Sequence, residues 1–268
     1  MSDLNSLRHR MNEAAERAAS LLFEHDLIGQ WIEGAIYPSE MAYFLAACEA
    51  LEIEAVIESG RQDGYSTEIL GRWAGCRNVE VTSIDLEEDQ VRAARCRHRV
   101  RGLPIRLLQG SAYDVFGREV HRQRGRRTAV LVDGPKSWPA ISMMCAAIEP
   151  HVQVLAIHNL APNLPERSWF EANGARFYET EIAPAMRGWA ELRRREIDHA
   201  RESRAVRSLD QSSLGITVLD GERRAKLRRA SGAVFGLHQP YVVRLLWRLG
   251  AFALTPKLYG LSQTLVGR

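Results

Sequence analysis

The sequence predicts an α/β fold with a doubly wound, mostly parallel sheet, and three observations favour it. Short apolar segments alternate with helix-like patterns from residue 55 to residue 220, as in a parallel sheet covered by helices on both faces. A glycine turn, Gly60–Gly64, follows the first apolar segment. Four segments end in polar residues, which should converge at one edge of the sheet. These are Glu58, Asp85, Asp133 and His158.

Three parts are predicted along the chain: a helical cap over residues 1–54, a Rossmann-like domain over 55–220 and a helical C-terminal extension over 221–268. In the cap, an apolar stripe predicts an amphipathic helix over residues 1–30, and Ser39 is placed to cap a second helix. Seven strands are predicted, over residues 55–57, 79–85, 105–108, 128–133, 152–158, 176–182 and 214–219. Helices are predicted from the glycine turn to about residue 73 and over 88–99, 139–148, 166–173 and 191–207.

Composition excludes several classes of protein. The chain has 268 residues, 46% hydrophobic and 26% charged, which is ordinary for a soluble globular protein. A net charge of only +3 does not predict nucleic-acid binding. The four cysteines lack metal-ligand or disulfide-framework spacing, and the sequence shows neither a signal peptide nor an apolar stretch long enough to cross a bilayer. A cytoplasmic location is therefore predicted.

Two arginine-rich segments have simple interpretations. Residues 118–127 predict a solvated helix face or loop. In residues 222–268, apolar clusters stand among arginines. This tail either packs on the domain, forms a dimer interface or makes peripheral contact with a membrane surface. Packing or a protein interface is favoured, so a homo-oligomer is expected.

The glycine turn predicts a nucleotide-like site, because glycine lets a ligand approach the backbone and the following helix presents free N–H groups. Asp85 is placed to accept hydrogen bonds from two ribose hydroxyls. The alternatives are an ordinary strand-to-helix turn and a surface acid. The turn lacks the middle glycine of the GxGxxG fingerprint, which argues against a dinucleotide.

The order of motifs resembles the class I S-adenosylmethionine-dependent methyltransferases over roughly residues 37–220, and more narrowly the catechol and caffeoyl-CoA type O-methyltransferases. The segments that carry the resemblance are Glu58–Ser66 (ESGRQDGYS), Asp85, Gly110–Asp114 (GSAYD), Val132–Lys136 (VDGPK) and His158-Asn159. The resemblance implies that S-adenosylmethionine is the cofactor. The residues implied for its methionine and ribose parts are Glu58, Gly60, Gly64, Tyr65, Ser66 and Asp85, and those for its adenine are Ser111, Ala112 and Tyr113.

The resemblance also implies catalytic residues. Asp133 would ligate a divalent metal and Lys136 would serve as base, while His158 and Asn159 match two further metal ligands. A metal ion would lower the pKa of the acceptor hydroxyl, and a lysine beside the cation would lose its own proton more easily. Methyl transfer in line to the oxygen would then owe much of its rate to orientation.

Three departures from the family pattern stand out. Bulky Gln62 lies in the glycine turn, where methyltransferases usually have a small residue, and Pro135 lies inside the Asp-x-x-Lys turn. His158 stands where the family has an aspartate. This exchange should weaken Mg²⁺ binding and favour a transition metal. Alternatively, no metal is bound and His158 is a general base.

The predicted function is therefore S-adenosylmethionine-dependent O-methyl transfer to a small hydroxylated acceptor, such as a sugar, a nucleotide-linked sugar or a polyphenol. The arginines at 187, 193, 194 and 195 and the helix near Tyr37–Phe44 could line an acceptor with acidic groups. One alternative is a non-catalytic scaffold that works through its C-terminal tail. Another is a different enzyme on this sheet, such as an NAD-linked one.

Overall fold

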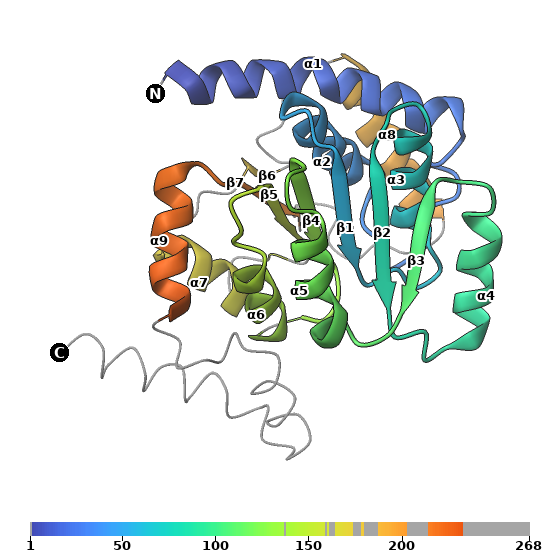
Figure 1. Cartoon of the computed structure of the whole chain (residues 1–268). Helices are drawn as coiled ribbons and strands as arrows, with labels where there is room; N and C mark the ends of the chain where they lie inside the picture. The colour runs from blue at the N-terminus through green and yellow to red at the C-terminus, as the bar shows by residue number, and fades with distance from the viewer. Residues whose placement is uncertain are drawn as a thin grey trace.

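The computed structural model of the chain describes residues 2–136, 138–158, 160, 164–173, 178–179, 187–202 and 214–232. At its centre is one sheet with the strand order β3-β2-β1-β4-β5-β7-β6 (Figure 1). Strands β1 to β5 are parallel, whereas β7 is antiparallel to both β5 and β6. The predicted α/β class with a doubly wound, mostly parallel sheet is confirmed.

The strands lie close to their predicted positions. Their bounds are β1 Ala55–Ser59, β2 Glu80–Asp85, β3 Ile105–Gln109, β4 Thr128–Val132, β5 Val152–Ile157, β6 Tyr178–Glu179 and β7 Gly215–Val218. Six of these described strands have four to six residues, and β6 has only two.

One prediction about the helices needs correction. The bounds are α1 Ser2–Glu24, α2 Pro38–Ala50, α3 Tyr65–Gly75, α4 Gln90–Arg99, α5 Ala112–Arg122, α6 Trp138–Ala146, α7 Pro165–Ala172, α8 Arg187–Glu202 and α9 Gly221–Gly232. Ser39 does not cap α2, because the helix begins at Pro38 and the Glu40 carboxylate accepts from the Tyr37 N–H. Residues 118–122 of the basic segment belong to α5, which agrees with the helix alternative for that segment; the start of α5 at residue 112 was not predicted. The predicted extension beyond Gly232 lies outside the described residues, as do parts of the predicted segments 176–182 and 191–207.

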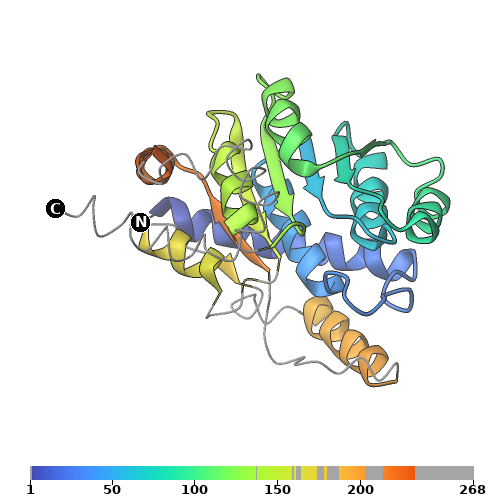
Figure 2. The ribbon, with the colours of Figure 1, turned by 90° about the horizontal axis from the view of Figure 1, so that it is seen from below.

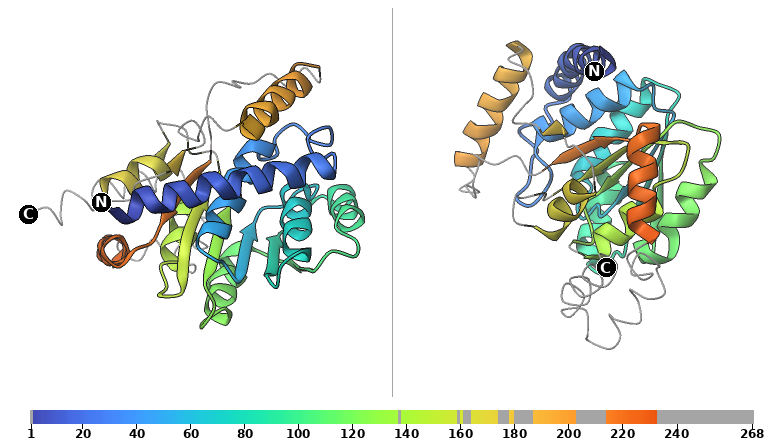
Figure 3. Two further views of the ribbon diagram at one scale, coloured as in Figure 1. Left: turned by 90° about the horizontal axis from the view of Figure 1, so that it is seen from above. Right: turned by 90° about the vertical axis from the view of Figure 1, so that its left-hand side faces the viewer.

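Alternate residues of the central strands face opposite layers of helices, as the twofold repeat of a strand requires. Val56 belongs to the apolar core shared with α1, α2 and α3, and its neighbour Ile57 to the core shared with α5, α6 and α7. The views in Figures 2 and 3 place α8 on the outer side of α1 and α2. The N-terminal helices and the sheet therefore share one core.

No helix among the described residues is long and apolar enough to span a membrane. The four cysteines all lie in the described part of the chain and are free thiols; Cys48, Cys96 and Cys145 are buried and Cys76 is exposed.

Candidate active site

The glycine turn brings the ends of β1 and β4 into direct backbone contact. Gly60 has a φ of 82°, and a Cβ atom at this residue would lie 2.6 Å from the backbone N of Gly134. The backbone N–H groups of Asp133 and Gly134 both donate to the Ser59 carbonyl, at 2.9 and 3.0 Å. A side chain at position 60 would separate these strand ends, so glycine is required here.

Asp85, at the end of β2, organises this turn through its carboxylate. Oδ2 accepts from the backbone N–H groups of Arg61 at 2.8 Å and Gln62 at 3.2 Å, and Oδ1 accepts from the Glu87 N–H at 2.7 Å. A carboxylate offers about four acceptor positions. Backbone N–H groups occupy three of these positions, so Asp85 can accept few further hydrogen bonds from a ribose diol.

Arg61 ties the turn to strands β2 and β3. Its buried guanidinium donates to the carbonyl oxygens of Ser83 at 2.8 Å and Leu108 at 3.0 Å, and it pairs with Glu87. Glu87 also pairs with Arg97 of α4 at 3.0 Å. The loop between β2 and α4 is thus fixed to the glycine turn by charge-assisted hydrogen bonds, which are stronger than neutral ones.

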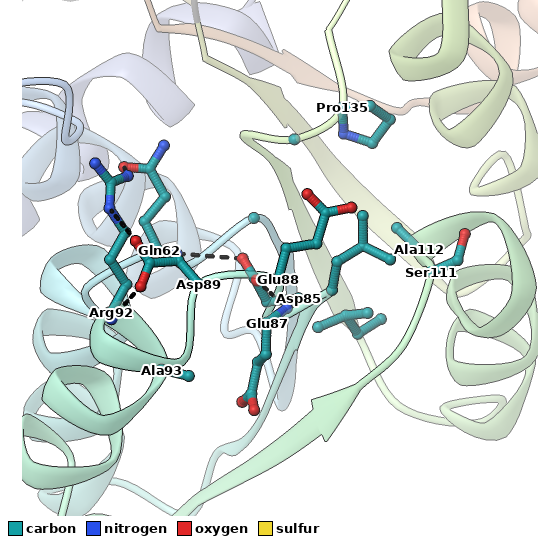
Figure 4. A pocket seen from close by; sticks show the side chains of 14 residues that line it. Gln62, Asp85, Glu87, Glu88, Asp89, Arg92, Ala93, Ser111, Ala112 and Pro135 are labelled. Atoms are coloured by element: carbon teal, nitrogen blue, oxygen red, sulfur yellow. Dashed lines mark hydrogen bonds and ion pairs between the residues drawn. The ribbon is translucent and has the colours of Figure 1, made fainter. Parts of the chain in front are cut away.

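A pocket of about 550 Å³ opens above this framework (Figure 4), a size typical of small-molecule sites. Its apolar lining includes Leu86, which is 52% exposed, and Ala112. Its charged lining residues are Asp85, Glu87, Glu88, Asp89 and Arg92. Arg61 and Arg97 offset the charge of Glu87, but Asp85, Glu88 and Asp89 still outnumber Arg92 in the lining. This excess of carboxylates favours a ligand with a positive charge and opposes a pyrophosphate.

Three residues expected to bind the cofactor support the turn instead of lining this pocket. Glu58 is fully buried and accepts from the hydroxyls of Ser66, Thr67 and Ser83 at 2.5–2.6 Å. Burial raises the pKa of Glu58, although these hydrogen bonds oppose the rise. The Tyr65 hydroxyl donates to the Leu27 carbonyl at 2.7 Å. Tyr65 and Ser66 line only a second cavity of about 10 Å³ beside Asp133.

The three expected catalytic side chains do meet, at the end of β4. His158 Nδ1 lies 2.6 Å from Asp133 Oδ1, and Lys136 Nζ lies 2.5 Å from the same oxygen. Burial opposes ionisation of Asp133, but the charges and hydrogen bonds of His158 and Lys136 outweigh it and lower its pKa to about 2. The Lys136 side chain is 43% exposed and that of His158 only 6%. Lys136 is therefore the member that a second substrate can reach.

The described side chains do not fit the expected metal site. Oδ1 of Asp133, a metal ligand in the expectation, is shared between the ammonium of Lys136 and the Nδ1–H of His158. Both groups occupy the coordination positions of a cation on that oxygen. Among the described residues no group of three His, Cys, Asp or Glu side chains is arranged to hold a metal ion. Asn159 lies outside the described residues.

Behind His158, a buried polar network reaches α8. Oε2 of Glu40 lies 3.6 Å from His158 Nε2, and its Oε1 accepts from the Leu214 N–H at 2.9 Å. On the preceding residue of α2, the Ser39 N–H and hydroxyl donate to Glu196 of α8 at 2.8 and 3.1 Å. Burial raises the pKa of Glu196 to about 7, and the nearby charge of Glu40 adds to the rise. The charge of Arg193 and the hydrogen bonds from Ser39 act in the opposite direction and lower this pKa.

This shift predicts that the protein loses stability as the pH rises from about 4.5 to about 7. The unfolded carboxyl titrates at 4.5 and the folded one at about 7, so the folded state binds the extra proton between these values. The shift corresponds to about 3 kcal/mol. Urea unfolding at several pH values checks this, and Glu196→Gln should remove most of the decline. The control Glu191→Gln, on the exposed part of α8, should retain it; an equal decline in the Glu196 variant would contradict the assignment.

Four of the nine residues expected at the cofactor therefore line the pocket: Gly60, Asp85, Ser111 and Ala112. Gly64 caps α3 and packs against Cys96. The side chain of Tyr113 lies outside the described part of the chain. Sequence reasoning missed Leu86 and Glu88, although an apolar residue beside a strand-end acid was a usable signal. It also missed the contact of Glu40 with His158, which no local pattern reveals.

Comparisons with known proteins show similarity only at the level of structure. No protein-family model matches the chain, and no curated protein matches it. An O-methyltransferase from Bacillus cereus in complex with SAH is 12% identical, over 76% of this chain and 91% of that one, with a TM-score of 0.44. The O-methyltransferase TomG from Streptomyces achromogenes in complex with SAM is 17% identical, over 78% and 90%, with a TM-score of 0.43. A SAM-dependent methyltransferase from Thiobacillus denitrificans in complex with SAH is 15% identical, over 73% and 97%, with a TM-score of 0.42.

The topology of the sheet is more informative than these identities. Five parallel strands in the order 3-2-1-4-5 are followed by an antiparallel β7 between β5 and β6. This is a doubly wound, mostly parallel α/β sheet with one antiparallel strand near its edge. In open α/β sheets, ligands bind outside the carboxyl ends of the parallel strands, which is where the acidic pocket and the Asp133 cluster lie.

Proposed function

We propose that this protein is an S-adenosylmethionine-dependent O-methyltransferase that acts on a hydroxyl group of a small acceptor. The acidic pocket at the ends of β1, β2 and β3 carries the proposal. It combines a size suited to a nucleoside, an exposed apolar side chain at Leu86 and an excess of carboxylates. A sulfonium nucleoside without phosphates matches this charge, whereas NAD, with its pyrophosphate, does not.

The cofactor would lie with its adenine between Leu86 and Ala112 and its sulfur toward Gly60 and Pro135, all of which line the pocket. S-adenosylmethionine held there would supply a methyl group whose bond to a positively charged sulfur breaks as the acceptor oxygen bonds to the methyl carbon. The Asp133 cluster follows directly on the pocket, because Gly134 and Pro135 line it and Lys136 comes next in the chain. An acceptor beside Lys136 would therefore be close to the methyl group.

The proton of the acceptor hydroxyl is assigned to Lys136, which accepts it as a neutral amine after its ammonium group has released a proton to solvent. Its side chain is the exposed member of the cluster, whereas His158 is buried between Asp133 and Glu40. Asp133 holds the amine in place through its Oδ1, and His158 fixes the orientation of that carboxylate. General base catalysis of this kind contributes about 10²–10⁴-fold to a rate.

The acceptor class is proposed to be a sugar, a nucleotide-linked sugar or a polyphenol. These molecules all offer hydroxyl groups. Positive charge is provided by Lys136, which follows the end of β4, and by the half-buried Arg193 of α8. We also propose that the chain forms a homo-oligomer through its C-terminal tail.

Methyl transfer from isotopically labelled S-adenosylmethionine to a panel of these hydroxylated acceptors tests the proposal. Transfer to at least one class is expected, and EDTA should not abolish it, because the described donor set does not fit a metal. Loss of all transfer with EDTA would contradict the argument that the described donor set does not fit a metal. Binding of the cofactor without transfer to any class would favour the scaffold function.

A further inference from the structure

Glu40 of α2 is a buried carboxylate that the reaction proposed above does not use. Its side chain is only 1% exposed, and a buried charge costs free energy unless it is paired and hydrogen-bonded. The helix α2 packs against both α8 and β5, and His158 directly follows β5. The contacts of Glu40 therefore show what this charge holds in place.

Two backbone donors from distant parts of the chain fix the Glu40 carboxylate. Its Oε2 accepts from the Tyr37 N–H at 3.2 Å, at the start of α2. Its Oε1 accepts from the Leu214 N–H at 2.9 Å, just before β7 and 174 residues further along the chain. The carboxylate cannot turn out of this position without losing at least one of these hydrogen bonds.

The same carboxylate faces the ring of His158. Oε2 of Glu40 lies 3.6 Å from Nε2, and Oδ1 of Asp133 lies 2.6 Å from Nδ1 on the other side of the ring. An imidazolium carries a proton on each of its nitrogens, so it is attracted to a carboxylate at both ends. Contacts at both ends fix the rotation of the ring, whereas a contact at Nδ1 alone would leave Nε2 unheld.

The rotation of His158 matters because its Nδ1–H shares Oδ1 of Asp133 with Lys136, whose Nζ lies 2.5 Å from that oxygen. If the ring turned, Nδ1 would leave Asp133 and the carboxylate could rotate. The amine of Lys136 would then lose its place beside the acceptor. A displacement of about 1 Å in a reacting group can lower a rate by about 10²-fold.

We propose that Glu40 is a positioning residue for methyl transfer. It holds the Nε2 side of the His158 ring, so that Nδ1 keeps Asp133 in the orientation that places the amine of Lys136. This inference rests on the proposed function, since it takes Lys136 to be the base. It assigns a role to a buried charge on α2, outside the parallel strands whose ends form the rest of the site.

Glu40→Gln tests the role of the charge. Glutamine keeps the length of the side chain and an oxygen for the Leu214 N–H, but it removes the carboxylate that faces His158. We expect kcat for methyl transfer to fall by about tenfold or more, because the base is displaced. The Kd for S-adenosylmethionine should stay nearly unchanged, since Glu40 is not among the residues that line the cofactor pocket. Glucose, UDP-glucose and catechol serve as acceptor probes, and calorimetry measures the Kd.

Ser39→Ala is the matched control on the neighbouring buried residue. It removes a hydroxyl that donates to Glu196 of α8 at 3.1 Å, so it perturbs the packing of α2 without touching His158. It should lower the stability measured by urea unfolding and leave kcat nearly unchanged. If Glu40→Gln does not fold, Glu40→Asp replaces it with the same expectation, because it keeps the buried charge but moves it away from His158.

A double variant shows whether Glu40 acts through His158. Asparagine in His158→Asn can still donate to Asp133, but its side chain is too short to reach Glu40. Adding Glu40→Gln to His158→Asn should therefore cause no further loss of kcat. Losses that multiply would show independent effects and overturn the inference, as would an unchanged kcat in folded Glu40→Gln or an equal loss in Ser39→Ala. If the folded, unmodified protein transfers methyl groups to none of the three probes, the proposed function fails and the inference fails with it.

Discussion

Lys136→Ala is expected to lower kcat for methyl transfer by about 10²–10⁴-fold, while the Kd for S-adenosylmethionine stays nearly unchanged. Lys136 is exposed beside the cofactor pocket and contacts Asp133 rather than the pocket lining. The substitution therefore removes the proposed proton acceptor without removing a cofactor contact. Steady-state kinetics with the acceptor and calorimetry with the cofactor measure the two effects separately.

Lys136→Arg separates the base from the charge. Arginine keeps a cation next to Asp133 but is effectively always protonated, so it cannot take up the proton of a hydroxyl. The arginine variant should be about as inactive as the alanine variant. Substantial activity in Lys136→Arg would show that position 136 serves only as a positive charge, and the proton would have to be assigned elsewhere.

Gly60→Ala should destabilise the protein by about 2–6 kcal/mol and weaken cofactor binding. The Cβ atom would lie 2.6 Å from the Gly134 nitrogen, and this neighbour is backbone that cannot rotate away. Strain at the positive φ contributes about 1–3 kcal/mol and overpacking a similar amount. Urea unfolding measures the free energy, and titration with S-adenosylmethionine measures the loss of affinity.

Gly102→Ala is the matched control, because Gly102 has nearly the same φ, 81° against 82°, and its Cβ atom would meet nothing within 4 Å. It should show the strain alone, about 1–3 kcal/mol, with cofactor binding intact. Equal destabilisation by the two substitutions would mean that the contact between the ends of β1 and β4 is not tight.

The fold was predictable because its signals are local. Unbroken apolar segments such as Ala129–Val132 in β4 mark strands buried on both faces, and their spacing leaves room for the helices between them. The start of α2 was predicted incorrectly, because serine is a residue type that commonly caps helices. The reason lies far away in the chain: Ser39 instead donates to Glu196, 157 residues later.

The site was predictable in position but not in the use of each residue. The sequence identifies Glu58 and Asp85 as strand-end acids, and both lie at the predicted edge. It does not show that Glu58 is satisfied by the hydroxyls of Ser66 and Ser83, or that backbone N–H groups occupy Asp85. Those partners depend on how the turn folds, which residue type and spacing do not determine.

Asp133 and His158 illustrate the same limit for the metal. Both residue types bind metals, and both follow neighbouring parallel strands, β4 and β5. The structure adds that the two side chains bond to each other and that Lys136 shares the Asp133 oxygen. Ligand types at the right strand ends are therefore insufficient evidence for a metal, because they can satisfy one another.

The most direct test of the account is calorimetric titration of the purified protein with S-adenosylmethionine and, separately, with NAD, each with and without EDTA. The account predicts binding of S-adenosylmethionine in the micromolar range, unaffected by EDTA, and no binding of NAD, because the acidic pocket repels a pyrophosphate. Binding of NAD, or of neither compound by a folded sample, would contradict the assignment of this pocket to a sulfonium nucleoside.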